Sequence, residues 1–475
     1  MAAQARKGVK RPKTARSTAP AKQLKTAQTA RFAAIETLCQ LERTCLPADV
    51  LFDSVAGQCM LIESDRHLAM NILYGVLRQR QALESVLQTL CNQPLAKIKP
   101  FVHQALLTGL YQIFFLDRIP ESAAVNESVK AVQAAHLPQN LQGFVNAVLR
   151  ESIRRKELLM PMTYHDREGA PFLNHPDWMV KRWTERFGKE EARRICMGNN
   201  QQSPLILNIN TCITTQASVK AAIEQEGIQV HAGNYSPDAL ILPDFHGAIN
   251  RLPGFAAGHF QVQDEAAQLL PQLLSMVRQD GLYLDACAGL GGKTSNLIQL
   301  GHGSNITIIA IEPDAQRQQK FRENMQRLHP DTSVTLVEKD LQHFAANCDV
   351  RFDGVLVDAP CSGTGVTGRH PDIRWNRRQS DLIRYQQIQL MLLNQAAGLV
   401  AANGILVYAT CSLEPEENEE VIKLFLADHP DYTLEDCTPF LPIPAQELVR
   451  EGCFVPRPGP SIDGFFGARM RRKEV

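Results

Sequence analysis

The 475-residue chain is 44% hydrophobic and 21% charged, and its 50 lysines and arginines balance its 50 aspartates and glutamates. Such a length exceeds what one hydrophobic core supports, which predicts several domains, and the composition is that of an ordinary folded protein. No apolar run reaches the ~18–20 residues that cross a bilayer, and no apolar segment follows the basic N-terminus, so we expect a cytoplasmic protein without membrane contact.

The 12 cysteines are scattered along the chain and form no C-x-x-C pair. Structural zinc sites need closely spaced ligands, and cytosolic chains rarely use disulfide frameworks. We therefore expect no bound metal, and each cysteine has to be judged by its own position.

Residues 1–28 form a basic segment that is rich in alanine, threonine and proline and contains no acidic residue. Such a segment cannot bury a core, so we expect it to be disordered. Two interpretations stay open: a basic arm that adds salt-sensitive affinity for nucleic acid phosphates, and a solvated tail.

Residues 29–155 carry apolar side chains at three- and four-residue spacing, as in the run from Leu68 to Leu77. That spacing predicts helices with one apolar face. Pro100, Pro120 and Pro138 mark breaks between successive helices. The pattern predicts an all-α domain.

Residues 156–172 contain two prolines and a glycine and are expected to be a linker. The segment 173–262 is mixed. Its pattern predicts a helical region at Trp178–Met197, a strand at Leu205–Ile209, a helix at Ala217–Gln225 and turns afterwards. We interpret it as a small α+β domain.

Residues 263–475 alternate short β-rich runs with helical stretches. This alternation predicts a Rossmann-like α/β domain, in which a parallel sheet has helices on both faces and binds ligands outside the carboxyl ends of its strands. The expected strands, in chain order, are Leu282–Leu284, Ile306–Ile311, Val334–Val337, Val355–Val357 and Ile405–Tyr408.

A glycine-rich loop from Asp285 to Thr294 follows the first of these strands and precedes a helix. Glycines at such a place let the backbone approach a ligand at the helix N-terminus. The loop matches two phosphate-binding motifs except at one position each. A P-loop would need a glycine at Cys287, and a dinucleotide-binding loop would need a glycine at Thr294. Glu312 ends the second strand, where an acidic residue suits a ribose. The residues favour an adenosine ligand, with S-adenosylmethionine, NAD and a loop without ligand all open.

Two further loops at the same edge carry a cysteine followed by a serine: Cys361 after the fourth strand and Cys411 after the fifth. A single cysteine is more often buried and inert. Two cysteines beside an adenosine site, however, suit methylation of carbon 5 of cytosine. That carbon attacks a sulfonium methyl group only after a thiolate has added to carbon 6. The carbon 5 proton must then leave and the thiol must be expelled, which gives a second cysteine a role.

The segment between the two cysteines is rich in arginine and aromatic side chains. Such residues suit phosphate contact and base stacking in RNA, whereas a solvated surface loop explains the composition equally well. The residues in question are Arg369, His370, Arg374, Trp375, Arg377 and Arg378.

The chain closely resembles the RNA cytosine-5 methyltransferases, specifically the bacterial 16S rRNA enzymes of the RsmB/Sun/Fmu type. The resemblance rests on DACAGLGGKT, VDAPCSGTGVTGRHPDIRW and YATCSLEPEENEEVI, and in the middle of the chain on NHPDWMVKRW and LPGFAAGHFQVQDEAAQLL. The helical part resembles the NusB-type domain of these enzymes through RIPESAAVNESVKAV and GFVNAVLR. Nearly everything beyond residue 28 is covered, and the combination of motifs is specific.

The resemblance implies a NusB-like N-terminal domain, a small RNA-binding α+β domain and a class I S-adenosylmethionine-dependent methyltransferase domain. It implies that Cys411 is the nucleophile and Cys361 the thiol that assists elimination, and that a monomer acts on cytosine 967 of 16S rRNA. The implied cofactor contacts are Cys287, Ala288, Gly289, Leu290, Gly291, Gly292, Lys293, Glu312, Asp340 and Asp358.

Three positions depart from the family pattern. Gly289-Leu290 replaces the usual Ala-Pro, which makes the loop less rigid. Glu312 replaces the commoner aspartate, and its extra methylene should still reach a ribose. Asn208 stands where relatives usually carry arginine, which is expected to remove one RNA contact from the middle domain.

Two other classes of function fit parts of the sequence. The near-miss loop motifs suit an ATP- or NAD-binding enzyme, and binding of labelled S-adenosylmethionine, ATP or NAD separates these cases. The helical domain and basic segment suit a non-catalytic RNA-binding factor, but a binding module needs neither the cysteine pair nor the acidic positions. An enzyme with these basic segments is expected to lose RNA affinity steeply as salt is added.

Overall fold

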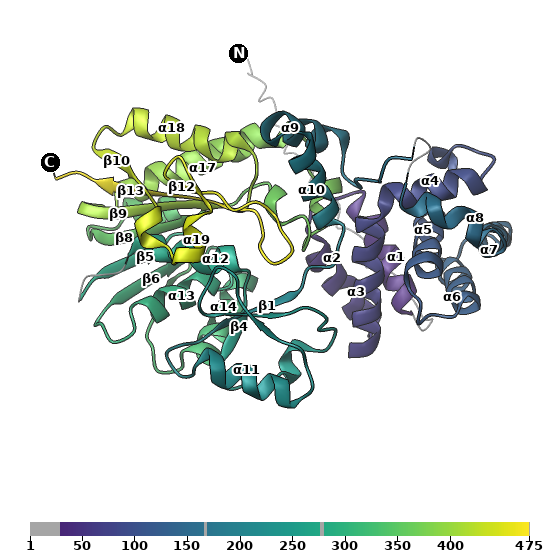
Figure 1. Cartoon of the computed structure of the whole chain (residues 1–475), viewed down its shortest axis with the longest axis horizontal. Coiled ribbons are helices and arrows are strands. Elements are labelled where there is room, and N and C mark those ends of the chain that lie inside the picture. Colours follow the sequence, from purple (N-terminus) through teal and green to yellow (C-terminus); the bar gives the residue numbers. More distant parts are fainter. Residues whose placement is uncertain (1–28, 166–168, 276–279, 475) are drawn as a thin grey trace, which may run out of the picture.

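The computed structural model describes residues 29–165, 169–275 and 280–474, so the basic segment 1–28 lies outside the described residues. A helical domain forms one side of the molecule and a large α/β domain the other, and a smaller middle part lies between them (Figure 1). The carboxyl ends of the central strands point toward this middle region.

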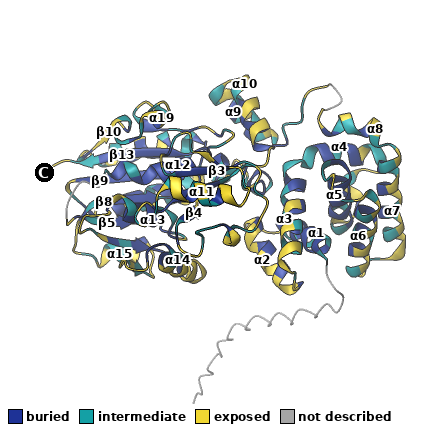
Figure 2. Ribbon diagram, turned by 60° about the horizontal axis from the view of Figure 1, so that its bottom comes forward, coloured by how far each residue is buried: buried dark blue, intermediate teal, exposed yellow. Residues whose placement is uncertain are grey.

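The N-terminal domain is a bundle of helices around α5 (Pro100–Phe115), which is buried along nearly its whole length (Figure 2). The prolines mark helix starts as predicted, because Pro100 opens α5 while Pro120 and Pro138 directly precede α6 and α7. The other helices are α1 (Ala30–Leu41), α2 (Ala48–Gln58), α3 (Glu63–Arg78), α4 (Arg80–Leu90), α6 (Glu121–Ala134), α7 (Gln139–Arg154) and α8 (Lys156–Leu159).

The middle part contains an antiparallel sheet in the order β2-β3-β1-β4, next to helix α11 (Gln216–Gln225). Its strands are β1 (Leu205–Ile209), β2 (His231–Ala232), β3 (Ala239–Leu242) and β4 (Phe260–Val262). The prediction of β1 and α11 is confirmed, whereas the prediction of turns after α11 is wrong because β2, β3 and β4 lie there. These strands have only two to four residues each, too few to show an alternating pattern.

The predicted helical region Trp178–Met197 is two helices, α9 (Asp177–Phe187) and α10 (Lys189–Asn199). Gly188 separates them with a φ of +85°, a conformation that favours glycine. Trp183 of α9 and Ile195 of α10 pack around Leu413, which belongs to the loop after β9. The two helices therefore support the C-terminal domain from outside.

The C-terminal domain has a sheet in the order β11-β12-β13-β9-β8-β5-β6-β7, with β10 paired to β13. Strands β7, β6, β5, β8 and β9 are parallel as predicted, but β13 runs antiparallel to β9 and makes the sheet mixed. The strands are β5 (Leu282–Asp285), β6 (Thr307–Ile311), β7 (Thr335–Val337), β8 (Phe352–Asp358), β9 (Val400–Thr410), β10 (Tyr432–Glu435), β11 (Val449–Arg450), β12 (Cys453–Phe454) and β13 (Phe466–Arg472).

Helices cover both faces of this sheet over two separate apolar clusters. Along β8, Leu356 belongs to one cluster while Val355 and Val357 belong to the other, as alternation along a strand requires. The helices are α12 (Glu265–Leu269), α13 (Gly292–Leu300), α14 (Ala315–Leu328), α15 (Leu341–Ala346), α16 (Ile373–Asn376), α17 (Asp381–Ala397), α18 (Glu419–Asp428) and α19 (Ile443–Gln446).

Candidate active site

Cys361 and Cys411 lie side by side at the carboxyl edge of the sheet. Because β8 and β9 are parallel neighbours, with Asp358 opposite Ala409, the loops that follow them begin at the same level. The two sulfur atoms are 3.2 Å apart, and both cysteines are free thiols. The two cysteine loops singled out by the sequence thus meet.

Cys411 faces a cavity of about 300 Å³ that Lys293 of the glycine loop and Asp358 also line. Cys361 does not line this cavity, so Cys411 presents its sulfur to a ligand there. The middle sheet closes one side of the cavity through Ile206 and Val262, and the other lining residues of the C-terminal domain include Arg369, His370, Asp463 and Phe465.

The two thiols are not equivalent. The hydrogen bond with Cys411, together with burial, raises the pKa of Cys361 well above its ordinary value. Cys361 therefore stays protonated at neutral pH, and its S–H is available as a donor to the Cys411 sulfur. Lys293 lines the same cavity as Cys411. A thiolate on Cys411 would have both an S–H donor and an ammonium group beside it.

The glycine loop is anchored by Asp285 at the end of β5. This buried carboxylate accepts hydrogen bonds from Oγ1 of Thr294 at 2.7 Å and from the N–H of Cys287 at 3.4 Å, and burial raises its pKa to about 6. Gly291 has a φ of +88°, and a Cβ there would lie 2.8 Å from the Met325 side chain. Only glycine fits this turn.

Lys293 pairs with Asp358, whose Oδ2 lies 2.7 Å from the lysine Nζ. Burial lowers the pKa of Lys293, but the surrounding acidic groups, with Asp358 the largest contributor, together more than offset that effect, so the pKa is raised and the lysine keeps its charge. The pair connects the start of α13 to the end of β8 and holds a cation in the cavity that Cys411 faces.

The two other acidic positions end neighbouring strands. Glu312 follows β6, is only 4% exposed, and accepts a hydrogen bond from the N–H of Asp314 at 2.7 Å. Asp340 follows β7, is exposed, and caps α15 by accepting from the N–H of His343 at 2.7 Å. Both carboxylates lie at the sheet edge where adenosine ligands bind in this fold.

The residues around the loop fit a cationic adenosine ligand. Burial, followed by the charges of Asp285, Asp358 and Glu312, raises the pKa of the Cys287 thiol, so these carboxylates all act on the same loop. A Cβ at Gly289 would meet no atom within 4 Å, which leaves space beside the loop. An open backbone loop among carboxylates is electrostatically complementary to a sulfonium cation.

Two of the predicted RNA contacts, Arg374 and Trp375, make hydrogen bonds within the protein. Arg374 is fully buried, and its guanidinium donates to the backbone carbonyls of Asn174 and Thr367, among other acceptors. Trp375 packs on the helical domain, and its indole N–H donates to the carbonyl of Leu77 at 2.8 Å. The interpretation of Arg374 as an RNA contact is wrong, because its side chain is buried and a sequence does not distinguish an arginine that joins domains from one that binds phosphate. Trp375 is half-buried, so its interpretation as an RNA contact stays a prediction.

We expect Arg374→Ala to lower the free energy of unfolding by about 3 kcal/mol or more, because several buried carbonyl groups lose their hydrogen-bond donor. Thermal unfolding measures this effect. Arg378→Ala, at an exposed position on the same segment, is the control and should leave the melting temperature unchanged. An Arg374→Ala protein as stable as the parent would contradict the role of Arg374 as a joint between domains.

The other two predicted RNA contacts, Arg369 and His370, do line the active-site cavity. The Nε of Arg369 is 2.7 Å from Asp463, and its Nη2 is 3.0 Å from Asp264. Burial, with the charge of Asp264, raises the pKa of Asp463 to about 7. Sequence reasoning missed Asp264 and Asp463, because no motif or spacing in the sequence predicts that both lie beside Arg369.

Asn208, a further position singled out by the sequence, is buried within the protein. Its side chain is 1% exposed, and its Nδ2 donates to Oε1 of Gln263 at 2.8 Å. The asparagine is thus bound within the protein, and the loss of an RNA contact relative to an arginine at this position stays a prediction.

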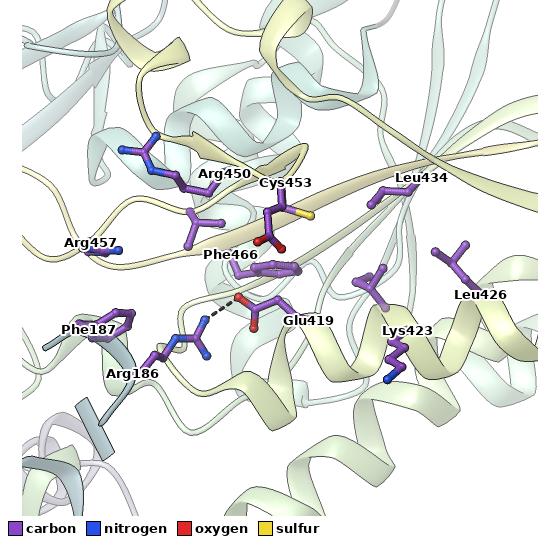
Figure 3. A pocket seen from close by; sticks show the side chains of 13 residues that line it. Arg186, Phe187, Glu419, Lys423, Leu426, Leu434, Arg450, Cys453, Arg457 and Phe466 are labelled. Atoms are coloured by element: carbon purple, nitrogen blue, oxygen red, sulfur yellow. Dashed lines mark hydrogen bonds and ion pairs between the residues drawn. The ribbon is translucent and has the colours of Figure 1, made fainter. Parts of the chain in front are cut away.

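A second cavity, of about 390 Å³, lies between the end of α9 and α18 (Figure 3). It shares no lining residue with the cavity that Cys411 faces. Arg186 and Glu419 form a 2.5 Å ion pair on its wall. Across the part of the chain that the structure describes, no cluster of three potential ligands could hold a metal ion, and no helix is long and apolar enough to cross a membrane.

Comparison with known proteins matches each of these parts. The family model of the 16S rRNA methyltransferase RsmB/F matches residues 271–471, that of the NusB family residues 28–154, and that of the RsmF/B-like ferredoxin-like domain residues 175–247. Ribosomal RNA small subunit methyltransferase B of Vibrio cholerae is 37% identical over 88% of this chain and 92% of its own length. This chain belongs to the RsmB/F family.

Other members of the RsmB/F family agree with this assignment. The probable ribosomal RNA small subunit methyltransferase B of Bacillus subtilis is 32% identical over 93% of this chain and 98% of its own length. The chain is thus an RNA methyltransferase with a NusB-like N-terminal domain, as the motifs predict.

Solved structures show the same fold. The crystal structure of PH0851 has a TM-score of 0.75 at 22% identity and covers 95% of this chain and all (100%) of its own. A methyltransferase homologue from Pyrococcus horikoshii has a TM-score of 0.53 at 29% identity and covers 63% of this chain and 96% of its own. The predicted combination of a helical, a small α+β and a Rossmann-like domain is confirmed.

Proposed function

We propose that this RsmB/F family member transfers a methyl group from S-adenosylmethionine to carbon 5 of a cytosine in 16S rRNA, with cytosine 967 as the position that the family resemblance implies. One observation carries the proposal: Cys411 faces the cavity that Lys293 of the glycine loop also lines, and the sulfur of Cys361 lies 3.2 Å from that of Cys411. Two thiols in contact at a methyl-donor site suit the addition and elimination that carbon 5 chemistry requires.

The cofactor site of the proposal is the loop Cys287–Lys293 with Glu312, Asp340 and Asp358. When bound, S-adenosylmethionine would supply an electrophilic methyl group. The buried carboxylate of Glu312 suits the ribose hydroxyls, and the carboxylates around the loop favour the sulfonium charge. Lys293 is held by Asp358 at the border between this loop and the cavity that Cys411 faces.

The RNA contacts of the proposal are Arg369 and His370, since both line the same cavity. The cytosine would have to leave its stack to reach Cys411, as bases that undergo chemistry do. The segment 1–28 is proposed as a basic arm that adds phosphate contacts.

In the proposed reaction the Cys411 thiolate adds to carbon 6, and the electron pair of the C5–C6 double bond moves to carbon 5, which takes the methyl group. That group would come from the sulfonium of S-adenosylmethionine, whose sulfur would keep the electron pair of the broken S–CH3 bond and leave as a neutral thioether. Solvent then takes up the carbon 5 proton. The electron pair of that C–H bond restores the double bond, and the S–C6 bond breaks with its pair returning to Cys411. Cys361 assists this elimination by donating its S–H hydrogen bond to the departing sulfur.

Bisulfite sequencing of 16S rRNA tests the proposal directly. RNA from cells that carry the gene should contain one cytosine that resists conversion, and this resistance should disappear when the gene is deleted and return when it is restored. An identical conversion pattern in all three strains would refute cytosine C5 methylation by this enzyme.

The Glu312 assignment predicts a loss of cofactor affinity. Glu312→Ala should raise the Kd for S-adenosylmethionine about tenfold to a hundredfold, because hydrogen bonds from hydroxyls to a buried carboxylate are each worth ~1.5–3 kcal/mol. Isothermal titration calorimetry measures the change. Glu338→Ala is the matched control, since Glu338 pairs with Arg322 on the exposed surface nearby. Equal affinities of all three proteins would remove Glu312 from the site.

A further inference from the structure

Glu417 is a buried carboxylate at the centre of the two cysteine loops. It ends the short 3₁₀ turn Pro415–Glu417 and is 0% exposed. Its Oε1 accepts hydrogen bonds from the N–H of Ser362 at 2.8 Å and from Nε2 of Gln389 at 3.0 Å. Its Oε2 accepts from the hydroxyls of Ser362 and Ser412. Four donors from three residues therefore converge on one side chain.

These contacts explain why a serine follows each cysteine. Ser362 is the next residue after Cys361, and Ser412 the next after Cys411. Because both hydroxyls bind the same oxygen of Glu417, one carboxylate ties both cysteine loops together. Other hydrogen bonds also join the loops, from the N–H of Gly365 to the carbonyl of Cys411 at 2.9 Å and from the N–H of Leu413 to Oγ1 of Thr364 at 2.9 Å. The Ser412 hydroxyl also lies 3.2 Å from the Ser362 hydroxyl and 3.3 Å from that of Thr364.

The carboxylate of Glu417 is held by hydrogen bonds from neutral groups and not by an ion pair within the described part of the chain. Among the described residues no ion pair involves Glu417, although a buried carboxylate is unfavourable unless its partners compensate for lost water. Burial raises its pKa, while the hydrogen bonds from Ser362 and Ser412 act in the opposite direction. An ionised carboxylate offers about four lone-pair positions on its two oxygens. Glu417 can therefore accept all four of these hydrogen bonds at once.

We propose that Glu417 is a positioning residue, which sets the separation of Cys361 and Cys411 by binding the serine that follows each. The inference rests on the proposed function only for its effect on methyl transfer, because the geometric claim concerns the two sulfur atoms alone. Without Glu417 each serine loses its shared acceptor, and the two loops can move apart.

The residues that follow Glu417 in the chain make contacts with a different part of the molecule. Figure 3 shows Glu419 at the start of α18 reaching Arg186 at the end of α9, in the cavity that neither Cys361 nor Cys411 lines. Glu419 therefore contacts α9, and Glu417, two residues earlier, contacts the cysteine loops. This difference provides a control within one segment.

Oxidative cross-linking measures the separation of the sulfur atoms without RNA or cofactor. Diamide converts two neighbouring thiols to a disulfide and is itself reduced to the hydrazine, and mass spectrometry identifies the peptide pair that contains Cys361 and Cys411. In Glu417→Ala we expect the rate of this disulfide to fall at least about tenfold. The kcat of methyl transfer should fall about a hundredfold with an unchanged KM for S-adenosylmethionine, since a misplacement of ~1 Å has that effect on a reacting group.

Two controls and two further variants complete the experiment. Glu419→Gln and Glu265→Gln should cross-link at the parent rate; Glu265 is equally buried but binds the N–H groups of residues 234–236. Glu417→Gln should be intermediate, because its amide oxygen still accepts and its NH2 can donate to the serine oxygens. The double variant Ser362→Ala, Ser412→Ala keeps Glu417 but removes the hydrogen bonds from both serine hydroxyls to it. If Glu417→Ala does not fold, this double variant tests the positioning role of Glu417.

Unchanged cross-linking and kcat in both Glu417→Ala and the serine double variant would overturn the inference. A parent protein that cross-links rapidly but makes no 5-methylcytosine would refute the proposed function while leaving Glu417 to be decided by the cross-linking rates.

Discussion

Cys411→Ala is expected to abolish methyl transfer, with a loss of at least about a thousandfold, because covalent nucleophiles acting in a concerted site show losses of this size when removed. Among the described residues that line the cavity, Cys411 is the only cysteine, and Cys361 does not line it. Incorporation of labelled methyl groups into 16S rRNA measures the rate, and calorimetry checks that S-adenosylmethionine still binds.

Cys45→Ala is the control for this variant, since Cys45 is exposed and belongs to the helical domain. It should methylate RNA at the parent rate. A Cys411→Ala protein that kept more than about a tenth of the parent rate would show that carbon 6 is not activated by this sulfur.

Cys361→Ala is expected to accumulate a covalent protein–RNA complex instead of turning over. Addition and methyl transfer need the Cys411 thiolate, whereas elimination loses the S–H group that lies 3.2 Å from the departing sulfur. A denaturing gel should show a slowly migrating species that contains both protein and RNA. Its amount should approach the amount of active protein, because each molecule stops after one addition.

The double variant Cys361→Ala, Cys411→Ala is the decisive control for that complex. It should form no adduct, because the nucleophile is absent. Free turnover by Cys361→Ala at the parent rate, or an adduct that persists in the double variant, would contradict the division of roles between the two thiols.

The elements that position the site were predictable because each produces a local signal. The strands before Asp285, Glu312 and Asp358 are continuous β-rich runs, and the glycine loop breaks the pattern where β5 meets α13. Adjacent parallel strands then predict that Cys361 and Cys411 lie close together. The 3.2 Å separation agrees with that reasoning.

The residues that sequence reasoning missed act across long distances in the chain. Asp264 and Asp463 both form ion pairs with Arg369. Glu417 joins the two cysteine loops, whose cysteines, Cys361 and Cys411, are 50 positions apart in the chain. No periodicity or motif carries such contacts, because they depend on how complete elements pack. The strands β10 to β13 were missed for a different reason, since three of them have two to four residues and β13 ends in charged residues.

The misassigned arginine shows where composition misleads. Arg374 lies between the two cysteines and close to aromatic residues, as an RNA contact would, yet its guanidinium is surrounded by backbone carbonyls of three parts of the chain. The indole N–H of Trp375, the next residue, donates to the carbonyl of Leu77 in the helical domain. The segment that bears Arg369 and His370 is thereby fixed against the helical domain, so this domain contributes to the shape of the active-site cavity.

The most direct test of the cysteine mechanism uses 16S rRNA in which cytosine is replaced by 5-fluorocytosine. Fluorine at carbon 5 cannot leave as a proton does, so the parent enzyme should stop after methyl transfer with its sulfur still bonded to carbon 6. Mass spectrometry of the digested complex should then find a methylated fluorocytosine on the peptide that contains Cys411. A complex linked through another residue, or no complex while unsubstituted RNA is methylated normally, would contradict the account.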